Sequence, residues 1–250
     1  MTTTPVLDNA LAPASTDSAT STLRTALTSA DRAEMLALLE RYFDGVSETQ
    51  FAHDLAEKDW VLRIRRDGRL VGFSTLQQYS TEYAGKRLNV IYSGDTIMAP
   101  EAWGAPVLAR RWIELVHALR ALRPLEPWYW LLLSSGFRTY RFLPLFWREF
   151  WPRHDAEPAA GPAALLTTLA RARFGRCFNA TMGIVRFSQP QRLRGDVAAI
   201  PEGRALDPHV RFFLQRNPGH AAGDELVCLT DLSDANLTAA GRRMVRGSRQ

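Results

Sequence analysis

One segment, Lys86 to Pro152, constrains the fold of this chain more than any other, because strand-like, turn-like and helix-like stretches alternate along it. Lys86–Met98 is an apolar run with β-branched residues, 99–106 is a turn-forming loop, and 107–122 carries apolar residues at helical spacing. Residues 128–133 then form a short apolar run typical of a buried strand. A strand–helix–strand unit of this size predicts a right-handed parallel crossover.

Ligands of such units tend to bind at the loops beyond the carboxyl ends of the strands. Here those loops are 99–106 and 134–140, and we look for function there. An aromatic, arginine-rich segment at 138–152 follows and is expected to be a helix.

The residues before this unit predict two helices and an antiparallel meander. The first helix starts at Ser29 and ends at Gly45, and the second spans 47–58. The pair Asp67-Gly68 is a strong signal for a two-residue hairpin turn. The expected strands are 60–65 and 70–79, with a turn near Gly85 before the third strand.

The residues after Pro152 predict a covering subregion of the same domain. The expected elements are a linker at 155–162, a helix at 163–174, a strand at 181–187, a loop at 189–205 and a strand hairpin made of 208–215 and 225–232. The expected organisation is a disordered tail at 1–22, a single domain at 23–240 with its core at 29–152 and its C-terminal helix and strands at 163–232, and a basic tail at 241–250.

The charge and cysteine content limit the classes of partner. The net charge of +5 favours an acidic partner such as a phosphorylated cofactor, an acidic carrier protein or nucleic acid, although a genome that prefers arginine codons explains it equally well. Cys177 and Cys228 lie far apart and have no metal-like spacing, and no metal site is expected. We find no membrane-spanning run and no signal peptide, so the expected location is the reducing cytoplasm.

The order of the elements resembles that of the GCN5-related N-acyltransferases, the acyl-CoA N-acyltransferase fold family, over residues 29–152. The resemblance implies an α/β (α+β) fold in which helices flank a mixed, mostly antiparallel central sheet. It also implies transfer of an acyl group from a thioester to an amine. In that family a loop with the pattern Gln/Arg-x-x-Gly-x-Gly/Ala holds the cofactor pyrophosphate on backbone N–H groups at the start of the next helix.

The equivalent loop in this chain is a degenerate version of that pattern. Only Gly104 and Ala105 match it. Pro106 lacks an N–H donor, and the carboxylate of Glu101 repels phosphate. Arg110 and Arg111, one turn further on, could supply positive charge in compensation.

Two residues are the candidate catalytic groups. Asp95 follows a glycine inside an otherwise apolar strand, so it is a candidate base or amine anchor, with a structural Asp at a β-bulge as the alternative. Tyr140 lies where the resembled family often places a tyrosine that protonates the leaving thiolate, and the alternative is a core aromatic. The residues expected to bind the acyl donor are Ile97, Met98, Trp103, Gly104, Ala105, Arg110, Ser134, Ser135 and Arg138.

The aromatic stripe from Phe142 to Trp151 has a specific and a general interpretation. It either packs in the core or forms an apolar pocket for a fatty or aryl acyl chain, rimmed by arginines. The leading hypothesis is an N-acyltransferase that uses an acyl-CoA or carrier-protein thioester and a small-molecule amine. The alternative is a non-catalytic protein of the same fold that binds an acidic partner or nucleotide-like ligand. RNA binding ranks low, and a homodimer is left open.

Overall fold

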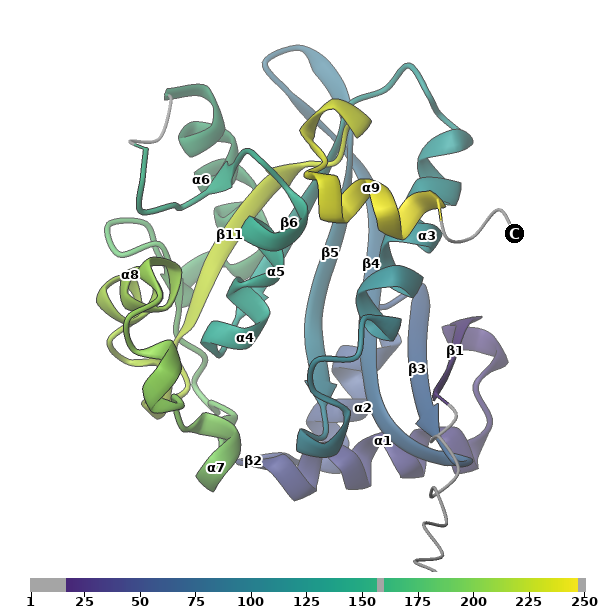
Figure 1. Ribbon diagram of the computed structural model, residues 1–250. Coiled ribbons are helices and arrows are strands. Elements are labelled where there is room, and N and C mark those ends of the chain that lie inside the picture. Colours follow the sequence, from purple (N-terminus) through teal and green to yellow (C-terminus); the bar gives the residue numbers. More distant parts are fainter. Residues whose placement is uncertain (1–16, 157–159, 247–250) are drawn as a thin grey trace, which may run out of the picture.

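The computed structural model describes residues 17–156 and 160–246, and Figure 1 shows how their elements are arranged. The strands are β1 (Asp17–Leu23), β2 (Phe43–Asp44), β3 (Trp60–Arg66), β4 (Arg69–Tyr83), β5 (Lys86–Met98), β6 (Trp128–Ser134), β7 (Phe150–Trp151), β8 (Phe178–Asn179), β9 (Ile184–Val185), β10 (Arg192–Leu193) and β11 (Glu225–Asp231). The α-helices are α1 (Ser29–Tyr42), α2 (Glu48–Ala56), α3 (Val107–Ala121), α4 (Phe137–Tyr140), α5 (Phe142–Phe146), α6 (Ala160–Phe174), α7 (Gly195–Ala198), α8 (Pro208–Arg216) and α9 (Ala239–Arg246).

A mixed sheet organises the described part of the chain. Its strand order is β1-β3-β4-β5-β6-β11-β9-β8, with β7 also paired to β11. Every pairing is antiparallel except that of β5 with β6, which the α3 crossover makes parallel. The predicted fold class, a mostly antiparallel sheet flanked by helices, is therefore confirmed.

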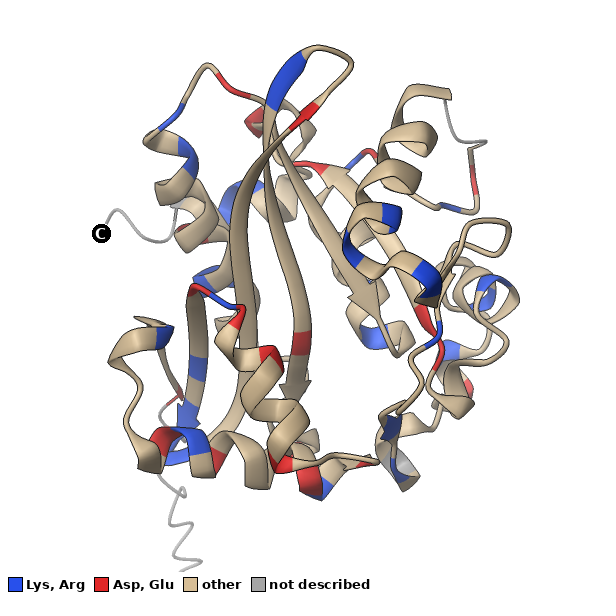
Figure 2. Ribbon diagram, turned by 180° about the vertical axis from the view of Figure 1, so that it is seen from behind, with Lys and Arg blue, Asp and Glu red and all other residues tan. Residues whose placement is uncertain are grey.

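Helices cover both faces of this sheet. In Figure 1 α3, α4, α5 and α9 lie in front of it, and the reverse view in Figure 2 shows α1, α2 and α6 on the other face. The alternation of β5 explains the two layers, because Ile91 packs in the core under α3, whereas Val90 and Tyr92 pack in a second core with Leu165 and Leu169 of α6.

The hairpin turn at Asp67-Gly68 and the start of the first helix at Ser29 are as predicted, and the cap of that helix is a further finding. Asp67 and Gly68 both have positive φ, 48° and 81°, as a tight two-residue hairpin turn requires. Thr28 caps α1 and forms a reciprocal capping box with Asp31. The predicted third strand, Lys86–Met98, has the same bounds in the structure.

The N-terminal and C-terminal expectations need correction. Residues 17–22, assigned to a disordered tail, form most of β1, whose backbone pairs with β3 along its whole length, while residues 1–16 lie outside the described residues. The basic tail from 241 is helical up to Arg246, because α9 packs against α3 and α5. Part of the predicted linker, 157–159, is also outside the described residues, and α6 starts at Ala160.

The second half of the chain departs further from the prediction. Residues 208–215 were predicted as a strand and are helical, because Asp207 caps the backbone and Pro208 occupies the first turn. No hairpin joins them to β11, which instead inserts beside β6. The strand at 181–187 shrinks to Ile184–Val185, and the loop at 189–205 contains β10 and α7. The helix expected over 138–152 is two short helices and β7.

Candidate functional site

The parallel strands β5 and β6 separate halfway along their length. They pair from Asn89 opposite Trp128 to Ser93 opposite Leu132. Beyond that point, within the described residues, β5 continues to Met98 with only β4 as its partner, while the end of β6 pairs with β11. The strands therefore diverge, and in the part of the chain that the structure describes one edge of β5 has no neighbouring strand from Gly94 to Met98.

A β-bulge lies where the divergence begins. Ser74 of β4 pairs with Thr96 and Leu76 pairs with Ser93, so one residue of β4 faces two residues of β5. A Cβ at Gly94 would lie 2.6 Å from the Tyr92 hydroxyl, so a larger residue there would have to displace this buried side chain. The bulge turns β5 away from β6 and presents the Asp95 side chain to the space between them.

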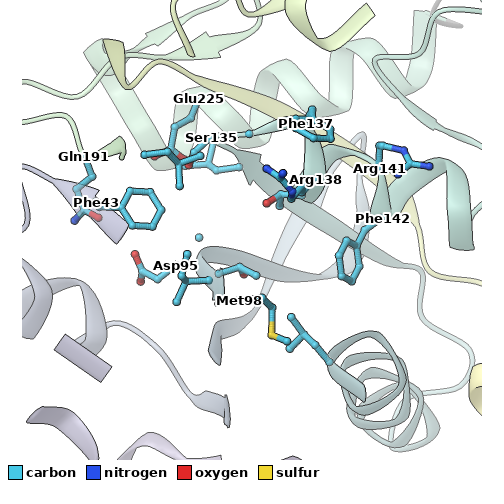
Figure 3. A pocket seen from close by; sticks show the side chains of 18 of the residues that line it. Phe43, Asp95, Met98, Ser135, Phe137, Arg138, Arg141, Phe142, Gln191 and Glu225 are labelled. Atoms are coloured by element: carbon cyan, nitrogen blue, oxygen red, sulfur yellow. The ribbon is translucent and has the colours of Figure 1, made fainter. Parts of the chain in front are cut away.

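That space is a cavity of about 1310 Å³ (Figure 3). Its wall is built from the end of β5, the loop at 102–106, the first turn of α3, α2, α4, α5, the end of α6, the 187–193 segment and α9. Segments from nearly the whole sequence therefore meet at the point where β5 and β6 part.

Asp95 lies at the acidic end of the cavity. Its carboxylate accepts a hydrogen bond of 3.1 Å from the Thr75 hydroxyl and lies 3.8 Å from the ammonium of Lys58. Lys58 is only 4% exposed, so this cation is held against the cavity wall. Asp54 of α2 lines the same end, and burial raises the pKa of its carboxyl although Gln50 donates a hydrogen bond to it. Asp95 is both a bulge residue and a cavity residue.

Glu225, the first residue of β11, faces Asp95 across the cavity (Figure 3). Its pKa is raised to about 8, first by burial and then by the negative charges of Asp95 and Asp54. A hydrogen bond from Ser135 and the charge of Lys58 act in the opposite direction. A carboxyl with a pKa near the ambient pH suits proton transfer, because both of its protonation states are then accessible.

Arg138 and Trp103 both line the cavity and stack on each other. The guanidinium of Arg138 stacks 3.6 Å from the centre of the Trp103 ring and donates to the carbonyl of Val197 at 2.8 Å. The Trp103 indole N–H donates to the carbonyl of Met98 at 2.9 Å. The stacked pair therefore ties the loop after β5 to α4 and to α7.

Most of the residues predicted to bind the donor line this one cavity. They are Ile97, Met98, Trp103, Gly104, Ala105, Ser135 and Arg138. Ser134 is fully buried beside Cys228, and Arg110 is exposed outside the lining. The first turn of α3 has Pro106 at its N-cap and no side-chain cap, which leaves its N–H groups available to an acceptor.

Tyr140 does not belong to the cavity wall. Its side chain is fully buried among Phe150, Phe212 and Phe213, and its hydroxyl donates to the carbonyl of Pro152 at 2.9 Å. Burial raises the pKa of this phenol. The position supports the alternative interpretation, a core aromatic with a satisfied hydroxyl, and gives no basis for the predicted role as acid.

Sequence reasoning missed Glu225, Asp54 and Lys58. A signal existed for Glu225, because two acids, Asp224 and Glu225, stand directly before the apolar run 226–229, where an acid needs a partner or a function. For Asp54 in α2 and Lys58 just after it, the helical periodicity shows which face of the helix is apolar. It does not show that the neighbouring polar residues border a cavity.

The described residues contain neither a metal-binding cluster nor a membrane-spanning helix. No group of three or more metal-binding side chains comes together in 17–156 and 160–246. Among the helices that the structure describes, none is both long and apolar enough to cross a membrane.

No protein-family model matches this sequence, and no curated protein matches it. Among solved structures, a GNAT family N-acetyltransferase from Escherichia coli in complex with CoA is similar at 20% identity over 53% of this chain and 70% of that chain, with a TM-score of 0.37. A conserved protein of unknown function from Enterococcus faecalis is similar at 12% identity over 86% of this chain and 66% of that chain, with a TM-score of 0.41. An acyl-CoA N-acyltransferase from Pseudomonas aeruginosa is similar at 18% identity over 46% of this chain and 79% of that chain, with a TM-score of 0.33.

The fold follows from the strand pairing itself. An antiparallel meander, β3 to β5, leads through the α3 crossover into the parallel strand β6, and the parallel pair diverges at a bulge. This chain has the fold of the GCN5-related N-acyltransferases, as the element order of its sequence predicted.

Proposed function

We propose that this chain is an N-acyltransferase that moves an acyl group from a thioester, acyl-CoA or a carrier-protein thioester, to an amine of a small molecule. The observation that carries the proposal is the divergence of β5 and β6 into a cavity that has carboxylates at one end and an apolar wall at the other. The carboxylates suit the amine and the apolar wall suits the acyl group of the thioester, and the reaction needs both groups in one cavity.

The free edge of β5 supports binding of the thioester. Backbone N–H and C=O groups of a strand point alternately to its two sides, so within 94–98 some of them point away from β4 and into the gap. An N–H at this edge polarises the thioester carbonyl and stabilises the negative charge that develops on its oxygen. The uncapped first turn of α3 and the positive φ of Gly104, 84°, suit a phosphate group at the outer end of the donor.

The two facing carboxylates support binding and activation of the amine. Asp95, paired with Lys58 and Thr75, stays in place and attracts a protonated amine. Glu225 first takes one proton from the bound ammonium, which leaves a neutral amine whose lone pair attacks the thioester carbon. The C–N bond forms and the C–S bond breaks. A second proton passes from nitrogen to the leaving sulfur, which departs as a thiol, and Glu225 returns the first proton to solvent.

The test is release of free thiol from acyl-CoA in the presence of a panel of primary amines. The wild-type chain should release thiol with at least one amine, and Glu225→Gln should reduce kcat/KM by about 100-fold to 10,000-fold, the usual contribution of a general base. Glu82→Gln, at an exposed glutamate far along β4, is the charge-matched control. Saturable acyl-CoA binding without release of thiol for any amine would instead favour the non-catalytic alternative.

A further inference from the structure

One limb of the cavity has a mostly apolar wall. It lies between α3, α5 and α9 and runs outward from the end of β5. In Figure 3 the side chains of Met98 and Phe142 lie near each other, and Asp95 lies further to the left. Arg243 of α9, an exposed residue, contributes a basic group to this wall. The apolar residues of the wall have no hydrogen-bonding nitrogen or oxygen in their side chains, and they are Met98, Leu108, Phe142, Phe146, Ala240 and Met244.

Helix α9 is attached firmly enough to act as a wall of this limb. The backbone N–H of Thr238 donates to the carbonyl of Phe146 at 3.0 Å, and its hydroxyl donates to the carbonyl of Leu145 at 2.7 Å. Gly241 allows the close approach, because a Cβ there would lie 2.5 Å from the Phe146 carbonyl oxygen. Ala240 and Met244, one turn apart, then project toward the limb.

The chemistry of the limb restricts what it can hold. A pantetheine arm carries amide groups, and amides placed against the apolar part of this wall would lose hydrogen bonds with water, with Arg243 as the charged donor that α9 contributes to the lining. An acyl chain carries no such groups and gains free energy for each methylene that leaves water. The limb also belongs to the same cavity as Asp95 and Glu225, so its occupant is joined to the reacting centre.

From this we infer that the acyl donor carries a medium or long aliphatic chain, and that the chain lies in the limb between α3, α5 and α9. This inference rests on the proposed function and names its donor class. An acetyl group would leave the limb unfilled. The part of the wall that α5 contributes, Phe142 and Phe146, belongs to the aromatic stripe that the sequence analysis interpreted as a possible acyl-chain pocket.

Calorimetric titration of the full chain with CoA, acetyl-CoA and decanoyl-CoA tests this without knowledge of the acceptor. Affinity should rise by roughly fourfold for each buried methylene, so decanoyl-CoA should bind at least about 50-fold tighter than acetyl-CoA. Equal affinities for the three ligands, or no binding of any of them, would overturn the inference. Tight binding of decylamine with no gain from the acyl chain would also overturn it, because the limb would then belong to the acceptor.

Two neighbouring alanines of α9 provide a matched pair of variants. Ala240→Phe fills the limb and should remove most of the advantage of decanoyl-CoA over acetyl-CoA. Ala239→Phe places the same ring on an exposed position outside the lining and should keep that advantage. Met244→Trp is a second filling variant in case Ala240→Phe does not fold. An unchanged preference in the folded filling variants would overturn the placement of the chain.

The two proposals fail in different ways. If acetyl-CoA binds as well as decanoyl-CoA and thiol is released with an amine, the N-acyltransferase proposal stands and the chain-length inference is wrong. If decanoyl-CoA binds tightly and no amine accepts the acyl group, the limb is confirmed as an acyl site and the transferase proposal is wrong.

Discussion

The ammonium of Lys58 lies 3.8 Å from Oδ2 of Asp95, and both groups border the cavity between the diverging strands. Lys58 follows α2 and Asp95 sits in the β5 bulge, so the pair links the helical layer to the strand on which the proposed chemistry takes place. The positive charge also opposes the rise in the pKa of Glu225 that burial and the nearby carboxylates cause. Lys58 therefore influences the proposed base without a direct contact.

Replacement of Lys58 by Met should move the pH dependence of acyl transfer. Without the ammonium the pKa of Glu225 rises further. The increase of kcat/KM with pH therefore occurs at higher pH, and the rate at pH 7 falls by roughly threefold to tenfold. A pH–rate profile from pH 6 to 10 measures the shift. Lys86→Met, at an exposed position at the start of β5, is the control, and an unshifted profile for Lys58→Met would contradict the prediction.

Glu225→Gln should stabilise the fold at alkaline pH. The folded pKa of about 8 lies above the reference value of 4.5, so the folded state binds more protons between these values and loses stability as the pH rises through them. Glutamine does not ionise, so the variant does not lose this stability as the pH rises. The variant should match the wild type near pH 4 and exceed it by about 1–3 kcal/mol near pH 8. Urea unfolding at several pH values checks this, and a constant difference between the two proteins would disprove it.

Tyr140→Phe should affect stability and not turnover. The hydroxyl is used in a buried hydrogen bond to Pro152, so its loss costs about 1 kcal/mol of folding free energy. Thermal unfolding and steady-state thiol release from the same preparation separate the two effects. A drop in kcat of tenfold or more in a folded variant would restore Tyr140 as the acid that the sequence suggested.

Arg138→Lys should behave like a loss of the side chain. A lysine keeps the charge but cannot stack flat on Trp103 while donating to Val197, because it lacks the planar guanidinium. Hydrogen exchange over 195–204 should increase, and donor affinity should fall by roughly fivefold to 30-fold, since about 1–2 kcal/mol is typical of a stacked cation. Arg211→Lys, at an exposed position on α8, is the control. Exchange unchanged from the wild type would rule out the tie between α4 and α7.

Local sequence determined the elements whose signals act over a few residues. Asp67-Gly68 specifies its turn because both residues must take positive φ, and the apolar run Lys86–Met98 specifies β5 because its length and branching favour an extended backbone. The order of these elements was enough to predict the crossover, the parallel pair and the fold class. In α8 the local signal, Asp207 followed by Pro208, was also present and outweighed the strand prediction.

Tertiary structure decided the features that depend on contacts between distant segments. The polar stretch of β1 forms a strand because β3 offers a backbone edge to pair with. The side-chain pattern of β1 does not predict this pairing. Tyr140 is buried because Phe212 and Phe213 of α8 pack on it. Glu225 faces Asp95 because β11 inserts beside β6, and its raised pKa exists only where the folded chain removes water from carboxylates that are remote in sequence.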